Sequence, residues 1–278
     1  MKKQYKSAPL PFVGQKRMFA REFRKVMEQY QDGTTFVDLF GGSGLLSHIA
    51  KCQHPHSKVV YNDFDNYRQR LQNIRHTNML LTDIREIVGT KVPRGKRIPA
   101  DLKTQILNRI AQEQQQVGFV DYITISTSLL FSMKYALSFE ELQKETLYNT
   151  IRKTDYPLCD DYLEGLDVIS CDYKHLFEQY KDVSDVVFLV DPPYLSTDVG
   201  TYNMCWGLAD YLDVLSVLNG HSFVYFTSNK SAILELCDWI GRNGTLGNPF
   251  ACASKVEFNA TTNYNSTYTD IMLYKKAR

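Results

Sequence analysis

Short apolar runs alternate with amphipathic stretches in the first and last parts of the chain. Strands are predicted for five runs: Thr35–Phe40, Lys58–Asp65, Asp167–Tyr173, Val186–Val190 and His221–Asn229. Helices are predicted at 17–30, 45–51, 174–180, 208–218 and 231–240. Such an alternation is typical of a parallel sheet with helices on its faces. The last part of the chain predicts an antiparallel hairpin, Lys255–Phe258 with Tyr268–Tyr274, joined by Asn259–Thr267.

Residues 66–165 break this alternation. They contain three predicted helices, at 66–87, 101–116 and 139–152, and a basic loop with two glycines and two prolines at 89–99. A stretch of helices that interrupts a strand–helix pattern predicts an inserted subdomain. The fold expected is therefore an α/β core made of 1–65 and 166–278, with a mostly helical insert at 66–165.

The run Val186–Val190 leads into the motif Asp191-Pro192-Pro193-Tyr194. Five consecutive apolar residues predict a strand buried on both faces, and the two prolines must end it because they cannot donate to a sheet ladder. The motif then lies at the carboxyl end of a core strand, where open α/β sheets bind their ligands. It offers a carboxylate, a backbone carbonyl and an aromatic ring. These groups suit a flat heterocycle with an exocyclic amine.

A second ligand site is predicted beside the first two strands. The strand Thr35–Phe40 runs into the turn Gly41-Gly42-Ser43-Gly44, and Asp63 follows 19 residues after Gly44, at the end of the next strand. Glycines let a ligand approach the backbone, and an acid at that distance can accept hydrogen bonds from both hydroxyls of a ribose. The combination indicates a cofactor that contains adenosine. Phe64 either stacks on its adenine or is an ordinary core residue.

The formal net charge of the 278-residue chain is +1, so any nucleic-acid surface must come from local segregation of charge. Residues 66–118 hold ten Lys and Arg against four acids, whereas 119–172 hold four against ten. The basic loop is either a solvated loop or a nucleic-acid contact. Its candidate contact residues are Lys91, Arg94, Lys96 and Arg97.

Cysteine usage and hydropathy argue for a reduced, cytoplasmic protein. The six cysteines are scattered and form no Cys-x-x-Cys pair. No apolar run is long enough to span a membrane, and the basic start of the chain lacks the apolar segment of a signal peptide. Cys52, His54 and His56 are close in sequence but have no fourth ligand at structural spacing, so no metal site is expected.

The order of these motifs resembles the Dam-like (α-group) DNA adenine-N6 methyltransferases over Pro9–Lys51, Val59–Asp65 and Ile169–Lys275. The resemblance implies a Rossmann-like core with a mixed, mostly parallel sheet and an antiparallel terminal hairpin, and an insert that recognises the target. It implies catalysis by Asp191, Pro192, Pro193 and Tyr194. It also implies that S-adenosylmethionine is held by Phe12, Lys16, Asp38, Phe40, Gly41, Gly44, Asp63, Phe64, Asp172 and Asp191.

The function implied is site-specific methylation of a flipped-out adenine in double-stranded DNA. The protein would be a bacterial or phage-encoded monomer, with a restriction endonuclease as an optional partner. Two departures leave the target sequence unpredicted. Phe12 stands where the family usually has Trp or Tyr, and the insert lacks the Asn-Gly segment and basic hairpin of the GATC-specific members.

Three alternatives stay open. RNA adenine would need the same pocket chemistry. Cytosine-N4 and protein-glutamine methyltransferases tend to begin the motif with Asn or Ser, so Asp191 favours adenine. A nucleic-acid-binding module with an inactive methyltransferase core is the non-enzymatic alternative, but Gly41, Gly44, Asp63 and Asp191 are all present.

Overall fold

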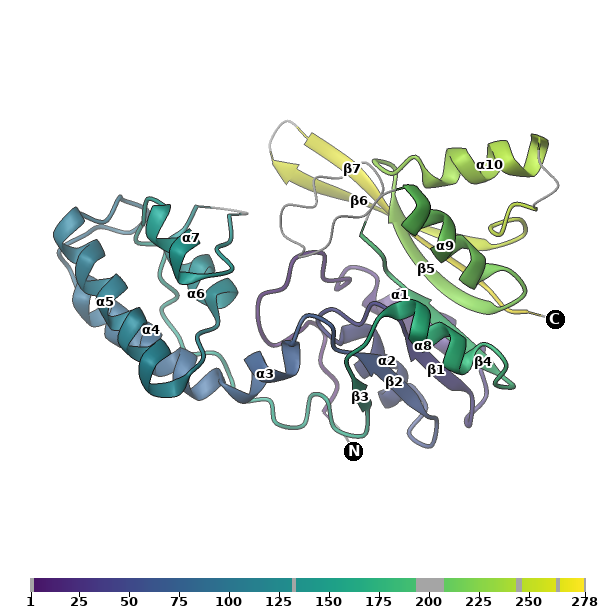
Figure 1. The fold of residues 1–278 in the computed structure, drawn as a ribbon, viewed down its shortest axis with the longest axis horizontal. Coiled ribbons are helices and arrows are strands. Elements are labelled where there is room, and N and C mark those ends of the chain that lie inside the picture. Colours follow the sequence, from purple (N-terminus) through teal and green to yellow (C-terminus); the bar gives the residue numbers. More distant parts are fainter. Residues whose placement is uncertain (1–2, 132–133, 194–207, 244–246, 264–265, 278) are drawn as a thin grey trace. The chain divides into compact units, whose positions relative to one another are not determined.

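The computed structural model describes residues 3–131, 134–193, 208–243, 247–263 and 266–277 (Figure 1). The chain forms two compact units. The first unit comprises Met1–Ser7, Gly14–Asn66 and Asp161–Arg278. The second comprises Ala8–Val13 and Tyr67–Asp160, so it holds most of the predicted insert together with a short N-terminal segment.

The first unit is built on a seven-stranded sheet, as counted over the described residues, in the order β3-β2-β1-β4-β5-β7-β6. The first five strands are parallel, and β7 and β6 are antiparallel. The strands are β1 (Thr35–Asp38), β2 (Val59–Asn62), β3 (Asp167–Ile169), β4 (Val186–Val190), β5 (Ser222–Ser228), β6 (Ser254–Asn263) and β7 (Ser266–Lys275). The fold class predicted from the sequence, a mostly parallel α/β sheet with an antiparallel end, is confirmed.

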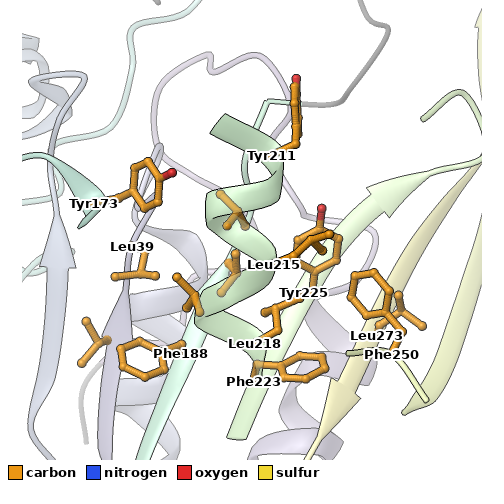
Figure 2. Packing of buried hydrophobic residues seen from close by; sticks show 14 of the residues in the cluster. Leu39, Tyr173, Phe188, Tyr211, Leu215, Leu218, Phe223, Tyr225, Phe250 and Leu273 are labelled. Carbon is orange, nitrogen blue, oxygen red and sulfur yellow. The ribbon is translucent and has the colours of Figure 1, made fainter. Parts of the chain in front are cut away.

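Helices cover both faces of this sheet, because successive strand residues point to opposite sides. On one face α1 (Ala20–Met27) and α2 (Leu45–Gln53) pack against a cluster that includes Val187, Leu189 and Phe226. On the other face lie α8 (Tyr173–Tyr180), α9 (Leu208–Leu218) and α10 (Ile233–Asn243). Figure 2 shows α9 with Leu215 and Leu218 among Phe188, Phe223 and Tyr225. All five residues of β4 are buried, as its unbroken apolar run predicts.

The second unit is helical. Its helices are α3 (Tyr67–Gln72), α4 (Ile74–Val88), α5 (Ala100–Val117), α6 (Tyr122–Leu129) and α7 (Phe139–Lys144). A buried ion pair fixes its interior: Arg70 Nε donates to Asp121 Oδ1 at 3.0 Å, and Arg70 Nη2 donates to Pro11 O at 2.7 Å. The same Asp121 oxygen accepts from the Thr124 N–H at 3.0 Å, which caps the start of α6. These bonds join α3, α6 and the segment 8–13 into one unit.

Several predicted boundaries in these elements were wrong. The helix predicted at 139–152 ends at Lys144, because the following residues form backbone hydrogen bonds with the basic loop. The helix predicted at 66–87 divides at Asn73 into α3 and α4. The terminal strands extend into the predicted connection Asn259–Thr267, where the antiparallel backbone pairing continues as far as Asn263 and Ser266.

Candidate active site

A buried ion pair marks the carboxyl end of β4. Asp191 follows this strand directly, and its Oδ2 lies 2.7 Å from Lys16 Nζ. Lys16 also donates to the Gly14 carbonyl at 2.7 Å, and its ammonium group lies 5.8 Å from the centre of the Phe226 ring. The side chains are 8% exposed for Lys16 and 18% for Asp191. The pair is therefore largely withdrawn from water, where ionic interactions are strong and the loss of one partner is costly.

Two opposing effects set the acidity of Asp191. Burial raises the pKa of its carboxyl group, and the Lys16 ammonium lowers it through charge attraction and a hydrogen bond. The negative charge of Asp270 raises it further, so that the pKa of Asp191 stays above its ordinary value. Lys16 is thus the group that favours the ionised carboxylate at this position.

Asp38 ends β1, the strand next to β4 in the sheet. Its Oδ2 accepts a hydrogen bond from Ser47 Oγ at 2.6 Å. Its Oδ1 is buried and makes no hydrogen bond of standard geometry within the described residues. Burial is the largest cause that raises the pKa of Asp38 to about 7; the Ser47 hydroxyl opposes it and the charge of Asp191 adds to it. The backbone N–H groups of Phe40 and Ser47 also lower this pKa, so both lie near the carboxylate, and a bound ligand would add a partner of better geometry to Oδ1.

The residues packed around the turn after β1 require glycine in that turn. A Cβ atom on Gly41 would lie 2.3 Å from ring atoms of Tyr61, whose side chain is fully buried. The Tyr61 hydroxyl donates to the Gly42 carbonyl at 2.7 Å. Gly44 precedes α2 with φ of +71°, a conformation that residues with a Cβ rarely adopt. The turn therefore has a packing reason for its glycines, in addition to any approach by a ligand.

Asp63 lies at the end of β2, the next strand along the same edge. It is 5% exposed, and its Oδ1 lies 3.0 Å from the Tyr61 hydroxyl. The preceding residue, Asn62, connects three strand ends, because its amide donates to the carbonyls of Leu39 and Cys171 at 2.9 Å each. Asn62 was missed by sequence reasoning, although an amide beside a strand-terminal acid is a usable signal.

The remaining cofactor candidates differ in environment. Phe40 packs against Tyr173 with ring centres 4.8 Å apart, whereas Phe64 is 48% exposed. Asp172 is exposed and caps α8, where its Oδ1 accepts from the Lys174 N–H at 2.7 Å. That hydrogen bond gives Asp172 a helix-capping role independent of any ligand.

Phe12 belongs to the second unit, where it packs edge-to-face on Tyr67 with ring centres 5.7 Å apart. The Tyr67 hydroxyl also accepts from the Leu10 N–H at 3.0 Å. Phe12 thus belongs to the second unit, whereas Lys16, four residues later, belongs to the first and pairs with Asp191.

Of the predicted motif at 191–194, Pro192 is buried and Pro193 half-buried. Tyr194 lies outside the described residues. The four loop cations Lys91, Arg94, Lys96 and Arg97 are exposed on the second unit.

Asp270 of β7 is a further acid that the sequence did not reveal. It pairs with Ser228 of β5, two positions from the pair Phe226 and Met272. Because strand residues alternate, Asp270 shares the face of Phe226, which is the face of Lys16. Its effect on the pKa of Asp191 agrees with this placement. The register that brings it there depends on long-range strand pairing.

Two further properties concern the described residues as a set. None of their His, Cys, Asp and Glu side chains gather in threes in a way that could hold a metal ion. None of their helices has both the length and the apolar character needed to cross a bilayer.

Comparison with known proteins points to one reaction. The family model of the D12 class N6 adenine-specific DNA methyltransferases matches residues 12–219. A protein of Haemophilus influenzae described as a putative methyltransferase is 35% identical over 281 residues, covering 99% of this chain and 94% of the relative. An rRNA methylase of Streptococcus thermophilus of known structure aligns over 96% of this chain and 99% of its own, with 10% identity and a TM-score of 0.35. So weak a structural likeness supports no conclusion.

S-adenosylmethionine is the methyl donor of an adenine-N6 methyltransferase, and the sheet edge suits it. Asp38 and Asp63 are buried carboxylates at adjacent strand ends of this edge. The family match covers 208 of the 278 residues. The chain belongs to the D12 class N6 adenine-specific DNA methyltransferase family.

Proposed function

We propose that this methyltransferase acts on adenine N6 in double-stranded DNA, after the target base has left the helix. The observation that carries the proposal is the buried Lys16–Asp191 pair at the end of β4, beside the buried carboxylate of Asp38 at the end of β1. A fixed acceptor next to a cofactor site is what a weakly nucleophilic amine needs. The family match supports adenine as the base.

Asp191 accepts one N–H bond of the adenine amine, and the carbonyl of Pro192 accepts the other. The lone pair of this amine is delocalised into the ring, so two acceptors that favour a pyramidal nitrogen stabilise the transition state more than the ground state. Lys16 favours the ionised form of the Asp191 carboxylate and holds its Oδ2 at 2.7 Å. S-adenosylmethionine, when bound, supplies a methyl group made electrophilic by its sulfonium sulfur. Methyl transfer would release the cofactor as its thioether, S-adenosylhomocysteine, and the methylated amine then loses its proton to water, so no strong base is needed beforehand.

The cofactor-binding roles are assigned from the family resemblance together with position at the sheet edge. Asp38, Gly41 and Gly44 hold the methionine portion, and Asp63 accepts from the ribose. Phe40 belongs to the same methionine loop, Phe64 and Asp172 border the adenine, and Phe12 and Lys16 are assigned to the cofactor by the resemblance. Asp172 is the weakest of these assignments in physical terms, because its carboxylate already caps α8. Tyr194, which lies outside the described residues, is assigned to stacking on the target base.

DNA rather than RNA is proposed because the matching family model describes DNA methyltransferases. A base paired inside a duplex cannot reach Asp191, since that carboxylate is largely buried at the sheet edge. The second unit is assigned to target recognition, with Lys91, Arg94, Lys96 and Arg97 on the phosphates. We expect a monomer in the cytoplasm of a bacterium or of a phage-infected cell. Light scattering tests the monomer.

Transfer of tritiated methyl groups tests the proposal directly. The purified protein is offered duplex DNA and RNA of the same sequences, and the product is digested to nucleosides. N6-methyladenine in DNA is the expected result. N6-methyladenine confined to RNA, or N4-methylcytosine, would replace the substrate proposed here. If calorimetry with S-adenosylmethionine gives no heat and no product forms, the inactive binding module is the better description.

A further inference from the structure

Three short segments run side by side on the second unit, with Tyr148 in the middle one. Arg97, in the basic loop, forms an isolated antiparallel bridge with Tyr148. The Asn149 N–H donates to the Lys96 carbonyl at 2.9 Å, which continues this pairing. On the other side, the Tyr148 N–H donates to the Leu129 carbonyl at 2.8 Å. The basic loop and the residues after α6 are therefore held on either side of Tyr148.

The side chains of these segments form a row of one cation and two aromatic rings: Arg97, Tyr148 and Phe131. Residues that face each other in an antiparallel bridge place their Cβ atoms roughly 5 Å apart on the same side, so the side chains of Arg97 and Tyr148 are neighbours. The ring centres of Phe131 and Tyr148 lie 4.3 Å apart, with an angle of 68° between the rings. This edge-to-face contact fixes the orientation of the Phe131 ring.

Phe131 is exposed in spite of this contact. Its side chain is 49% accessible to solvent. The other large apolar side chains that are exposed among the described residues of the second unit are Met79 and Leu158, neither of which is aromatic. A single exposed apolar side chain is common on protein surfaces, but this ring is held in one orientation beside a guanidinium group, so its exposed face can stack on a flat partner without further ordering.

The charges around the row identify the kind of partner. Within the described residues, Lys91, Arg94, Lys96 and Arg97 form no ion pair with a carboxylate. Some other cations of the same unit do, such as Arg85 with Asp155 and Arg109 with Asp83, but what sets the loop apart is that its four cations lie within the seven residues 91–97. Four cations without neutralising partners favour a polyanion, and a flat ring beside them favours a base.

The loop that carries these cations is fixed in place before any ligand binds. The Asn149 amide donates to the Val92 carbonyl at 2.6 Å, and Arg94 Nη1 donates to the Ile151 carbonyl at 2.8 Å. Val92 and Ile98 are buried beneath the loop. Binding therefore requires little ordering of the loop, which lowers the entropic cost of association.

We propose that Phe131, supported by Tyr148 and flanked by Arg97, stacks on a base of bound duplex DNA at a step where the helix has opened. This inference rests on the proposed DNA substrate. The loop cations hold the phosphates on either side, and the ring replaces part of the base stacking that opening removes. Loss of one base–aromatic stack lowers affinity by roughly tenfold.

Binding of a mixed-sequence DNA duplex, with or without one abasic site, tests the proposal by fluorescence anisotropy. The wild-type protein is expected to bind the abasic duplex more tightly. Phe131→Ala should lose roughly tenfold in affinity for that duplex and most of the preference, and Phe131→Trp should restore both. Met79→Ala, which removes another exposed apolar side chain of the same unit, is the matched control and should bind as wild type.

The Phe131→Trp variant also reports stacking directly. Its fluorescence should be quenched by the abasic duplex beyond the change seen in Met79→Trp, which carries the same background of two native tryptophans. Equal quenching in the two variants, or wild-type binding by Phe131→Ala, overturns the inference. A quench by RNA duplex but not by DNA also overturns it. These readouts measure binding and are independent of the methyl-transfer assay. If DNA is not methylated but Phe131 still stacks on it, the proposed function is wrong and the proposed DNA-binding surface stands.

Discussion

The two units differ in whether the charged side chains of their candidate sites are buried and paired or exposed. At the sheet edge of the first unit, Lys16 and Asp191 are largely buried and joined at 2.7 Å. In the basic loop of the second unit, Lys91, Arg94, Lys96 and Arg97 are exposed, and none forms an ion pair within the described residues. One region uses charge to fix a single geometry, and the other displays charge to solvent.

The interactions of the two regions therefore differ in strength and in how much salt weakens them. A buried pair is weakly screened, and removal of one partner leaves an uncompensated charge in a site of low polarity. Exposed cations are screened at ordinary ionic strength, and each contributes a small amount to the binding of a polyanion. Substitutions at the sheet edge should therefore change chemistry strongly, and substitutions in the loop should change affinity weakly and in a salt-dependent way.

The largest effect is expected for Asp191→Asn. The amide keeps the shape of the carboxylate but loses its charge, so methyl transfer should fall by about 10²- to 10³-fold, as for other lost transition-state hydrogen bonds. Single-turnover rates with saturating DNA measure the fall. S-adenosylmethionine should still bind in calorimetry. A variant that methylates at a near wild-type rate would remove Asp191 from the reaction.

Asp38→Asn should produce the next largest effect, on stability. The pKa of Asp38 in the folded protein, about 7, exceeds its ordinary value of 3.8, so the folded state holds this proton more tightly than the unfolded state. Stability is therefore lost as pH rises from about 4 to about 7. A shift of roughly 3 units corresponds to about 4 kcal/mol at most. Asn has no proton to lose, so the variant should become progressively more stable than wild type towards pH 8.

Denaturant unfolding at pH 5, 6, 7 and 8 measures this difference. The same variant should bind S-adenosylmethionine more weakly, because Asp38 is proposed to hold its methionine portion. A stability difference that does not change with pH would show that the Asp38 carboxyl is not withdrawn from solvent in the way described. Ser47→Ala, which removes the donor to Oδ2, is the companion variant and should raise the pKa of Asp38 further.

Lys16→Met should weaken methyl transfer at neutral pH, because the pKa of Asp191 rises and the ionised fraction falls by about tenfold for each unit by which that pKa exceeds the pH. Lys16 is the group that lowers this pKa against the effect of burial. An acid with a raised pKa is ionised only at higher pH, so the activity of the variant should recover as pH increases. Lys16→Arg keeps the charge and should retain the wild-type profile better. A pH-independent loss in Lys16→Met would assign Lys16 to cofactor binding alone.

Those features of the sheet edge that depend on residues close together in the chain could be predicted from the sequence. Five consecutive apolar residues predict the doubly buried β4, and the prolines after it predict its end. The distance from Gly44 to Asp63 predicts an acid at the end of β2 because a strand–helix–strand unit has a narrow range of lengths. The pairing of Lys16 with Asp191 spans 175 positions, and no property of either residue indicates it.

The second unit was harder to predict, because contacts between residues far apart in the chain override the local preference for helix or strand there. α6 is rich in Thr, Ser and Ile, which are poor helix formers, and it is stabilised by the Asp121 cap and by burial. Residues 147–151 look helical by pattern but form hydrogen bonds with the basic loop. The cations of this loop were recognised from charge alone, whereas the ring of Phe131 beside them depends on that same pairing.

The smallest effect is expected for Lys96→Gln. One cation fewer on the phosphates should reduce the slope of log affinity against log salt by about 0.9, which is a few-fold change in affinity at moderate salt. Lys25→Gln is the matched control, because it removes the same charge from a lysine that already pairs with Glu22 at 2.9 Å in α1. Anisotropy titrations at 50 to 200 mM salt, chosen as roughly the range in which counterion release is resolved, should separate the two variants. Equal slopes would mean that net charge alone governs binding. If the slope of log affinity against log salt is smaller in Lys96→Gln alone, a cation contributes to DNA binding only when no carboxylate of the protein neutralises it. That result would confirm the difference between the paired cations of the first unit and the exposed cations of the loop.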